Sequence, residues 1–179
     1  ESARACTAIS QCPIPVIVAV HDYCLGVGIE IVGSADIAIA NEEAVFQWTE
    51  IDNGTVGGAA QGFRMLPSQA LRYLMFTAEP VTARDLWSRG ALTEVVPSSE
   101  LTSRTEHVAE VIANKQPDLM RLLKSSMDSV EAVDIENAMR FEQGFIFQLN
   151  MEGTGSAART AFLDGTRQGV KKGSVQPDA

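Results

Sequence analysis

A glutamate in an otherwise apolar stretch is the first residue whose chemistry needs an explanation. Glu30 follows the glycine-bearing turn 26–28, and its neighbours are the apolar residues Ile29, Ile31 and Val32. A carboxylate in the first turn of a helix is stabilised by the helix dipole, which would explain it without any function. In a buried element, however, a carboxylate is costly unless it is paired, protonated or used. Glu30 is therefore a candidate catalytic acid or base.

The turn before Glu30 has the features of a site for an oxygen that gains negative charge. The segment Cys24–Glu30 is typical of a strand end, a turn with Gly26 and Gly28, and a helix start. Backbone N–H groups and the positive helix end point out of such a turn, and they suit a thioester carbonyl that becomes an enolate. A tight turn that needs glycine for steric reasons alone gives the same pattern. A dinucleotide-binding GxGxxG loop is excluded, because Ile31 stands where the third glycine belongs.

Glu50 is the second acidic candidate. It follows the short apolar strand expected over 45–48 and precedes Ile51, and a solvent-facing strand end would explain it equally well. Glu30 and Glu50 each follow a predicted buried strand, and ligands of open α/β folds collect at such strand ends. Two carboxylates in a partly apolar cleft can divide the roles of acid and base. The residues alone leave open whether the two side chains meet.

The elements that must position these residues alternate at first and then become helical. Strands are predicted over 15–20 (buried on both faces), 36–40, 45–48 and 92–96, with a turn at 21–23 and helices over 3–12, 29–34, 59–66, 68–76 and 82–90. Further helices are predicted over 99–115, 119–130, 135–151 and about 156–167. This order predicts an α/β core followed by an α-helical segment. The helix over 135–151 is so apolar that it must be packed centrally or meet another subunit.

The overall composition limits the classes of partner. The chain has 179 residues, 45% of them hydrophobic and 21% charged, with a formal net charge of -9. This charge argues against a nucleic-acid partner, because phosphate backbones need a positive face. No apolar run approaches the roughly 20 residues of a membrane-spanning helix. The three cysteines, Cys6, Cys12 and Cys24, lack metal or redox spacing, which predicts no bound metal and reduced thiols in a cytoplasmic compartment. No Met leads the chain, so we expect a piece of a longer protein.

Short motifs along the whole chain occur in the order and at the spacing of a known family. The matching segments are 13–20, 23–30, 35–40, 44–46, 50–51, 57–58, 64–67, 80–83 and 90–97. Together they resemble the enoyl-CoA hydratase/isomerase (crotonase) family, and the remaining helices are similar to that family's C-terminal helices.

This resemblance implies a fold, an assembly and a substrate. It implies part of a spiral ββα core over residues 1–98 and a helical oligomerisation segment over 99–179, in a homotrimer or hexamer. The substrate would be an acyl-CoA, with coenzyme A as part of the substrate and no further cofactor. Family members carry about a third more chain before Glu1, and that portion supplies the other oxyanion N–H and much of the CoA contact.

The resemblance also implies roles for individual residues in enoyl-CoA hydration, a hydro-lyase reaction of fatty acid metabolism. Glu50 would exchange the proton at the α-carbon, and Glu30 would help to activate the water that adds to the β-carbon. The backbone N–H of Val27 would be one donor of the oxyanion hole. The other residues matched to the substrate site are Cys24, Leu25, Gly26 and Gly58.

Two positions depart from the family pattern in ways that bear on these roles. The family usually has glycine at the position of Val27, and valine does not easily adopt a positive φ. The turn is therefore altered, or it never needed a positive φ there. Gly58 stands where the dienoyl isomerase branch has an acid, which disfavours that branch.

Three alternatives to hydration stay open. The segments 54–67, 72–82 and 140–153 are similar to a branch that opens cyclic β-diketone thioesters in steroid-ring breakdown. Because that branch does not rely on an acid at the position of Glu30, hydration is favoured. An enoyl-CoA isomerase is a further possibility, although isomerases often keep only the acid that matches Glu50. The third alternative is a non-catalytic subunit of an assembly, which Val27 and the apolar helix over 135–151 would fit.

Overall fold

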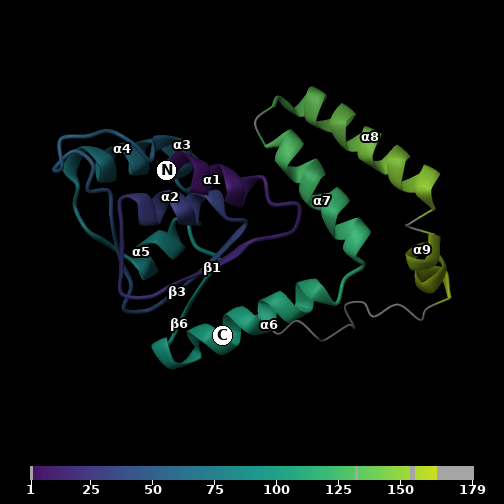
Figure 1. The fold of residues 1–179 in the computed structure, drawn as a ribbon, viewed down its shortest axis with the longest axis horizontal. Helices are drawn as coiled ribbons and strands as arrows, with labels where there is room; N and C mark the ends of the chain where they lie inside the picture. Colours follow the sequence, from purple (N-terminus) through teal and green to yellow (C-terminus); the bar gives the residue numbers. More distant parts are fainter. Residues whose placement is uncertain (1, 132, 154–155, 165–179) are drawn as a thin grey trace. The chain divides into compact units, whose positions relative to one another are not determined.

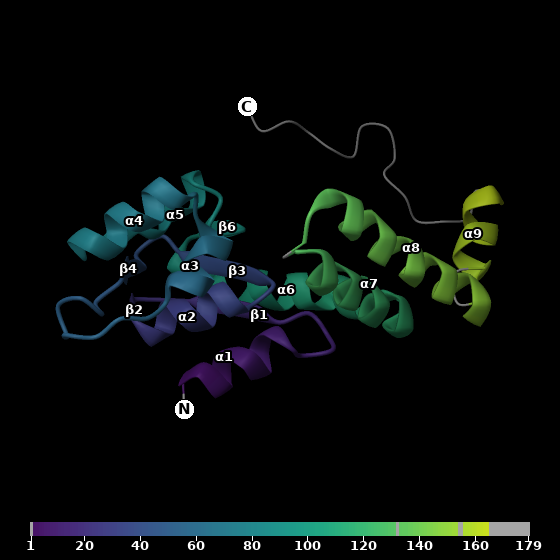
Figure 2. The same cartoon turned by 90° about the horizontal axis from the view of Figure 1, so that it is seen from above.

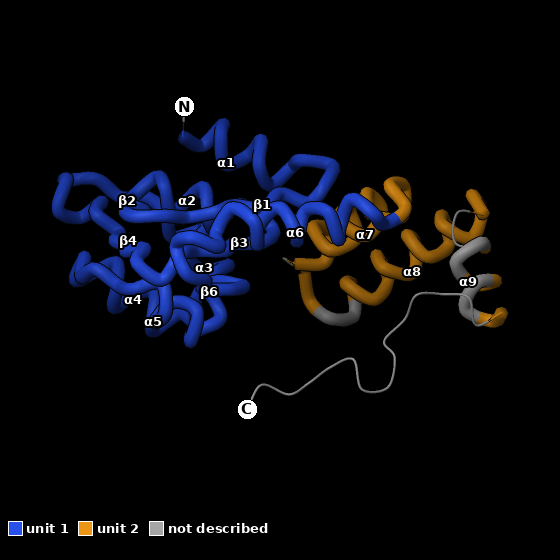
Figure 3. The backbone as a smooth tube through the Cα atoms, turned by 90° about the horizontal axis from the view of Figure 1, so that it is seen from below, with its two compact units in different colours: residues 1–115 blue, residues 116–179 orange. Residues whose placement is uncertain are grey.

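The computed structural model describes residues 2–131, 133–153 and 156–164, and the chain forms two compact units, 1–115 and 116–179 (Figure 3). The helices of the first unit are α1 (Ser2–Ser10), α2 (Val27–Ser34), α3 (Ala59–Met65), α4 (Ser68–Thr77), α5 (Ala83–Ser88), the short 3₁₀ helix η1 (Ser98–Glu100) and α6 (Leu101–Ala113). Its strands are β1 (Ile17–Val20), β2 (Tyr23–Leu25), β3 (Ile37–Asn41), β4 (Val45–Gln47), β5 (Val81–Thr82) and β6 (Glu94–Val96). Strands and helices alternate, which confirms the expected α/β architecture.

Two small sheets organise the first unit. In one, β3 lies between β1 and β6, and both pairings are parallel. In the other, β4 pairs with β2 in parallel and with β5 in antiparallel fashion. Parallel neighbours need a crossover connection, and α2 with β3 supplies it between β2 and β4 (α2 and β3 are labelled in Figure 1, β2 and β4 in Figure 2). Because Leu25 is paired with Gln47, the two strands end side by side, and the segments that follow them leave the same edge of the sheet.

The predicted strands are present, with three differences. Residues 21–23 were expected to be a turn, but β2 begins at Tyr23, and the two-residue β5 was not predicted. Both strands are too short to show a periodic hydrophobic pattern. The expectation of a first strand buried on both faces is wrong. Val20 is buried but Ala19 is exposed, because β1 lies at the edge of its sheet.

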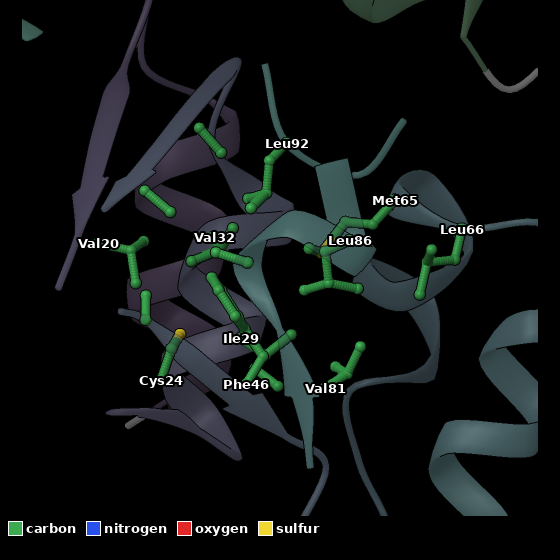
Figure 4. Packing of buried hydrophobic residues seen from close by; sticks show 14 of the residues in the cluster. Val20, Cys24, Ile29, Val32, Phe46, Met65, Leu66, Val81, Leu86 and Leu92 are labelled. Carbon is green, nitrogen blue, oxygen red and sulfur yellow. The ribbon is translucent and has the colours of Figure 1, made fainter. Parts of the chain in front are cut away.

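The core of the first unit fixes the orientation of α2. Ile29 and Val32 of α2 are buried and lie with Phe46 of β4 in one cluster (Figure 4). Full burial of an isoleucine or phenylalanine contributes roughly 1.5–3 kcal/mol. Successive residues of a helix are about 100° apart around its axis. Because Ile29 faces the core, the side chain of Glu30 lies at the margin of the core. The helix is covered by α1, which packs against it (Figure 2).

Helix α6 belongs to the first unit. It packs against β1 and β3, and Arg104 donates two hydrogen bonds of 2.6 Å to the carboxylate of Glu94 in β6. These hydrogen bonds lower the pKa of Glu94. The compact unit therefore ends at residue 115, whereas the sequence placed the end of the core at residue 98.

The second unit consists of helices only. Helices α7 (Pro117–Val130) and α8 (Ile135–Glu152) pack side by side, and α9 (Ser156–Leu163) follows. The carboxylate of Asp134 caps α8 by accepting the backbone N–H of Asn137 at 3.1 Å. The predicted last helix extended to about residue 167, and residues 165–167 lie outside the described part of the chain.

The apolar side chains of α8 are exposed in the single chain. They are Met139, Phe141, Ile146, Phe147 and Met151. The alternative in which this helix is packed centrally is therefore not found within one chain. Within the described ranges, no helix combines the length and the apolar character needed to cross a membrane.

Candidate functional site

The turn between β2 and α2 is built on Gly26. This residue is the N-cap of α2 and has φ 49° and ψ -115°, a conformation that L-amino acids other than glycine rarely adopt. A Cβ atom at Gly26 would also lie 3.1 Å from Oε1 of Glu50 and 3.2 Å from Oγ1 of Thr49. Glycine is thus required both for the backbone conformation and for the close approach of Glu50. The amide of Gly26 donates to the carbonyl of Gln47 at 3.1 Å, which ties the turn to the end of β4.

Val27 is the first residue of α2. The family usually has glycine at this position, but the backbone here does not need the positive φ that valine disfavours. Among the described residues other than glycine, only Asp22 and Ala78 have a positive φ, so the turn places no such demand on Val27. The amides of Ile29 and Glu30 donate to the carbonyl of Gly26. The amide of Val27 precedes the first intrahelical bond, and the described part of the chain offers it no carbonyl acceptor. This N–H is therefore free to bind an oxygen at the positive end of the helix.

The two carboxylate oxygens of Glu30 face different neighbours. Oε2 lies 3.9 Å from Sγ of Cys6, a buried residue of α1 that can act as a weak donor. Oε1 lies 3.0 Å from where a Cβ atom of Gly57 would stand. The thiol thus orients one oxygen and leaves the other directed at the loop after β4. Cys6 was not recognised from the sequence, because the chain pattern does not bring α1 next to α2.

Glu50 follows β4 and is half-buried. Its Oε1 lies beside the Gly26 turn, and its Oε2 is buried without a hydrogen-bond partner in the described structure. A buried polar atom left without a partner costs roughly 1–3 kcal/mol, and more when it is charged. Such a cost is expected at positions that are retained for function. The alternative of a solvent-facing strand end does not fit this carboxylate.

Gly57 lies close to both glutamates. A Cβ atom there would be 3.0 Å from Oε1 of Glu30 and 3.8 Å from Cγ of Glu50. Oε1 of Glu30 and Cγ of Glu50 are therefore no more than about 7 Å apart. The sequence left open whether the two glutamates meet, and the fold brings them to the same loop. The spacing is suited to a small molecule held between two groups that accept and donate protons.

One aromatic residue, Trp48, and one glycine, Gly58, lie on the Glu30 side of this loop. Trp48 directly follows β4, is 1% exposed, and its indole Nε1 has no hydrogen-bond partner in the described structure. Gly58 is the N-cap of α3 with φ 75°, and a Cβ atom there would lie 3.5 Å from Cδ1 of Trp48 and 3.6 Å from Cγ of Glu30. Gly58, which the sequence linked to the substrate, thus lies beside Glu30. Trp48 was interpreted only as part of a strand.

The other two residues matched to the substrate site have different surroundings. Cys24 is buried in the core beneath the turn, where burial raises the pKa of its thiol to about 11. Its Sγ is 3.3 Å from where a Cβ atom of Gly28 would stand, so its side chain packs under the start of α2. Leu25 is 42% exposed on β2. Leu25 can therefore contact a ligand with its side chain, whereas the thiol of Cys24 supports the turn from below.

Within the described residues, no three His, Cys, Asp or Glu side chains are grouped so that they could hold a metal ion. Two carboxylates thus lie close to one glycine, next to a helix N-terminus with an available N–H. Such a site can move protons to and from carbon and water while a developing oxyanion is stabilised.

Comparison with known proteins shows which family this chain resembles. Residues 2–165 match the family model described as enoyl-CoA hydratase/isomerase. The chain is 37% identical over 162 residues to the (7aS)-7a-methyl-1,5-dioxo-2,3,5,6,7,7a-hexahydro-1H-indene-carboxyl-CoA hydrolase of Rhodococcus jostii (strain RHA1), covering 90% of this chain and 63% of that protein. It is 31% identical to the short-chain-enoyl-CoA hydratase of Clostridium acetobutylicum, covering 84% of this chain and 59% of that protein. The chain thus spans about three fifths of the length of these relatives.

A solved structure supports the same assignment. The crystal structure of human enoyl coenzyme A hydratase domain-containing protein 3 superposes with a TM-score of 0.85 at 25% identity, covering 95% of this chain and 68% of that one. The crotonase-like fold expected from the motifs is therefore confirmed. The match of nearly the whole chain to the family model, together with this likeness in structure, shows that the chain belongs to the enoyl-CoA hydratase/isomerase family.

Proposed function

We propose that this chain carries the proton-transfer site of an enzyme that adds water to a coenzyme A thioester substrate. The observation that carries the proposal is the close approach of both Glu30 and Glu50 to Gly57. In this proposal the substrate thioester lies at the start of α2, where the N–H of Val27 stabilises its oxygen as negative charge develops. Glu30 accepts a proton from the attacking water, and Glu50 delivers a proton to the α-carbon.

Hydrolytic ring opening of a cyclic β-diketone acyl-CoA is the reaction we favour, in place of the hydration that the presence of Glu30 favoured from the sequence. It is supported by the 37% identity to the Rhodococcus hydrolase, whose name describes a bicyclic diketone carboxyl-CoA substrate. In this reaction water adds to a ring carbonyl while Glu30 takes its proton, and the adjacent C–C bond then breaks. The electron pair of that bond passes into the conjugated system, and Glu50 protonates the carbon that receives it. The product is a single acyl-CoA that has one ring fewer and carries a new carboxylate.

Hydration of an α,β-unsaturated acyl-CoA is the second candidate. The 31% identity to the Clostridium short-chain hydratase and the presence of both glutamates favour it. Here Glu30 takes a proton from the water that adds to the β-carbon, and Glu50 protonates the α-carbon on the same face. In this chain both reactions would use the same two carboxylates, although the ring-opening branch does not rely on an acid at the position of Glu30. The two reactions would then differ in the electrophilic carbon and not in the proton-transfer groups.

Oxygen-18 labelling separates the two reactions. The full-length protein is incubated in labelled water with crotonyl-CoA or with the CoA thioester of a cyclic β-diketone, and the products are analysed by mass spectrometry. Ring opening places the label in a new carboxylate, whereas hydration places it in a β-hydroxyl group. We expect labelled carboxylate from the diketone at a rate well above that of crotonyl-CoA hydration. If the folded protein turned over neither thioester, the proposal would be wrong and a non-catalytic subunit would be the better explanation.

A further inference from the structure

The indole N–H of Trp48 is a buried donor that has no acceptor among the described residues. Trp48 directly follows β4, two residues before Glu50, and it is 1% exposed. Its Nε1 has no hydrogen-bond partner within the described structure. Buried tryptophans usually find an acceptor for this group, because an unpaired buried donor costs free energy. A phenylalanine would fill much of the same volume without that cost, so the N–H needs an explanation.

The indole nitrogen of Trp48 lies near Glu30. A Cβ atom at Gly58 would lie 3.7 Å from Nε1 of Trp48 and 3.6 Å from Cγ of Glu30. The indole nitrogen and this carbon are thus no more than about 7 Å apart. Glu30 already has one oxygen next to the thiol of Cys6 and the other next to Gly57. A small oxygen-bearing molecule between the two side chains could therefore accept from the indole and donate to the carboxylate.

We propose that Trp48 is a positioning residue, whose indole N–H donates a hydrogen bond to the oxygen of the water that Glu30 deprotonates. This inference rests on the proposed function of the site. One O–H bond of the water then points at Glu30, and the remaining lone pair is aimed at the electrophilic carbon. The proton of that O–H passes to Glu30 as the new C–O bond forms, while the indole keeps its own proton. Fixing an attacking group in this way contributes to the rate through orientation.

Replacement of each of the two tryptophans by phenylalanine in the full-length protein tests this role. Trp87 of α5 is 48% exposed, so Trp87→Phe is the matched control. We expect Trp48→Phe to lower kcat for water addition roughly 10- to 100-fold, with KM changed less than threefold. Trp87→Phe is expected to leave both constants unchanged.

A second reaction distinguishes positioning from a structural defect. Exchange of the α-protons of butyryl-CoA with deuterated water needs the oxyanion donor and Glu50, but no added water. Trp48→Phe is expected to retain this exchange within about threefold of the unmodified protein, because only the alignment of the attacking water is lost. The variant Trp48→His provides a rescue, since Nε2 of histidine can occupy the place of the indole nitrogen. Some of the lost turnover should return, even if Trp48→Phe proves poorly folded.

The outcomes separate this inference from the proposed function. Water addition by Trp48→Phe at the rate of Trp87→Phe would overturn the positioning role and leave the proposed function intact. Equal losses of water addition and α-proton exchange, without rescue by histidine, would mean that Trp48 is structural, which also overturns the role. If Glu50→Gln left both reactions unchanged, the proposed function itself would fail.

Discussion

The two compact units of this chain differ in how far they bury their large apolar side chains. In residues 1–115, large side chains such as Trp48, Phe46 and Leu71 are fully buried. In residues 116–179, α7 and α8 pack together, but Phe147 is 67% and Met151 is 74% exposed. The buried polar atoms that lack partners in the described structure, among them Nε1 of Trp48 and Oε2 of Glu50, all belong to the first unit.

This contrast indicates a division of tasks between the units. The first unit closes its own core, and that core can hold polar groups in unfavourable surroundings at the proposed site. The helices of the second unit expose several large apolar side chains, such as Phe147 and Met151, and exposed apolar surface of this kind is typical of faces that contact another molecule. The homotrimer or hexamer implied by the family resemblance would provide such a contact, and it stays a prediction. The following experiments could contradict or refine this division.

The largest expected effect is the loss of turnover when Glu50 is replaced by glutamine. Glutamine keeps the size of the side chain but cannot exchange the proton, so kcat of the full-length protein should fall roughly 10²- to 10⁴-fold. Glu142→Gln on the exposed surface of α8 is the control and should be neutral. Steady-state kinetics with the accepted thioester measures both. Equal activity of the two variants would mean that the first unit does not hold the chemistry.

The next effect compares a core side chain with an exposed one. Leu71→Ala removes a fully buried side chain and should lower the free energy of unfolding by about 2–5 kcal/mol. Phe147→Ala should change the free energy of unfolding by less than about 0.5 kcal/mol, as surface substitutions usually do, unless this face is covered by another molecule. Urea denaturation at several protein concentrations measures both changes. A large, concentration-dependent destabilisation by Phe147→Ala would show that the second unit buries its apolar face in an assembly.

Replacing one glycine by alanine in each unit is expected to have smaller effects. The change in the first unit should lower kcat, whereas the change in the second unit should raise stability. The added methyl group of Gly57→Ala would stand 3.0 Å from Oε1 of Glu30, so it must displace that carboxylate and should lower kcat roughly tenfold. Gly144→Ala in α8 meets no atom within 4 Å, and alanine favours the helix by about 1 kcal/mol. Kinetics and thermal unfolding of both variants check these directions. Unchanged kinetics in Gly57→Ala would contradict the close placement of the two glutamates.

The smallest expected effect is a pH dependence that arises from Cys24. Burial raises the pKa of this thiol from 9.0 to about 11, so the folded state holds its proton where the unfolded state releases it. The contribution of Cys24 to stability is therefore complete below pH 9 and is lost as the pH rises towards 11. Urea unfolding of the unmodified protein and of Cys24→Ala between pH 8 and 11 measures the difference. A constant difference between the two proteins across this range would contradict the raised pKa.

Much of the site was predictable because its signals are local in the chain. The glycine turn, the helix start and an acid among apolar residues identified Glu30 within one short segment. Glu50 had no such signal, and the family resemblance selected it. Cys6 and Trp48 were missed as site residues, because their relation to Glu30 depends on α1 packing against α2 and on the loop that returns from β4 to α3.

The sequence by itself determined which elements form and which residue types are available, since hydrophobic periodicity, glycine and acidic residues act over a few positions. Only the tertiary structure decided which of these residues meet. The parallel pairing of β2 with β4 brings the ends of both strands to one edge, and Gly57 approaches both of the glutamates that follow them. The pairing of strands, and the path of the loop from β4 to α3 past Glu30, join positions that are far apart in the chain. No local pattern of residues specifies them.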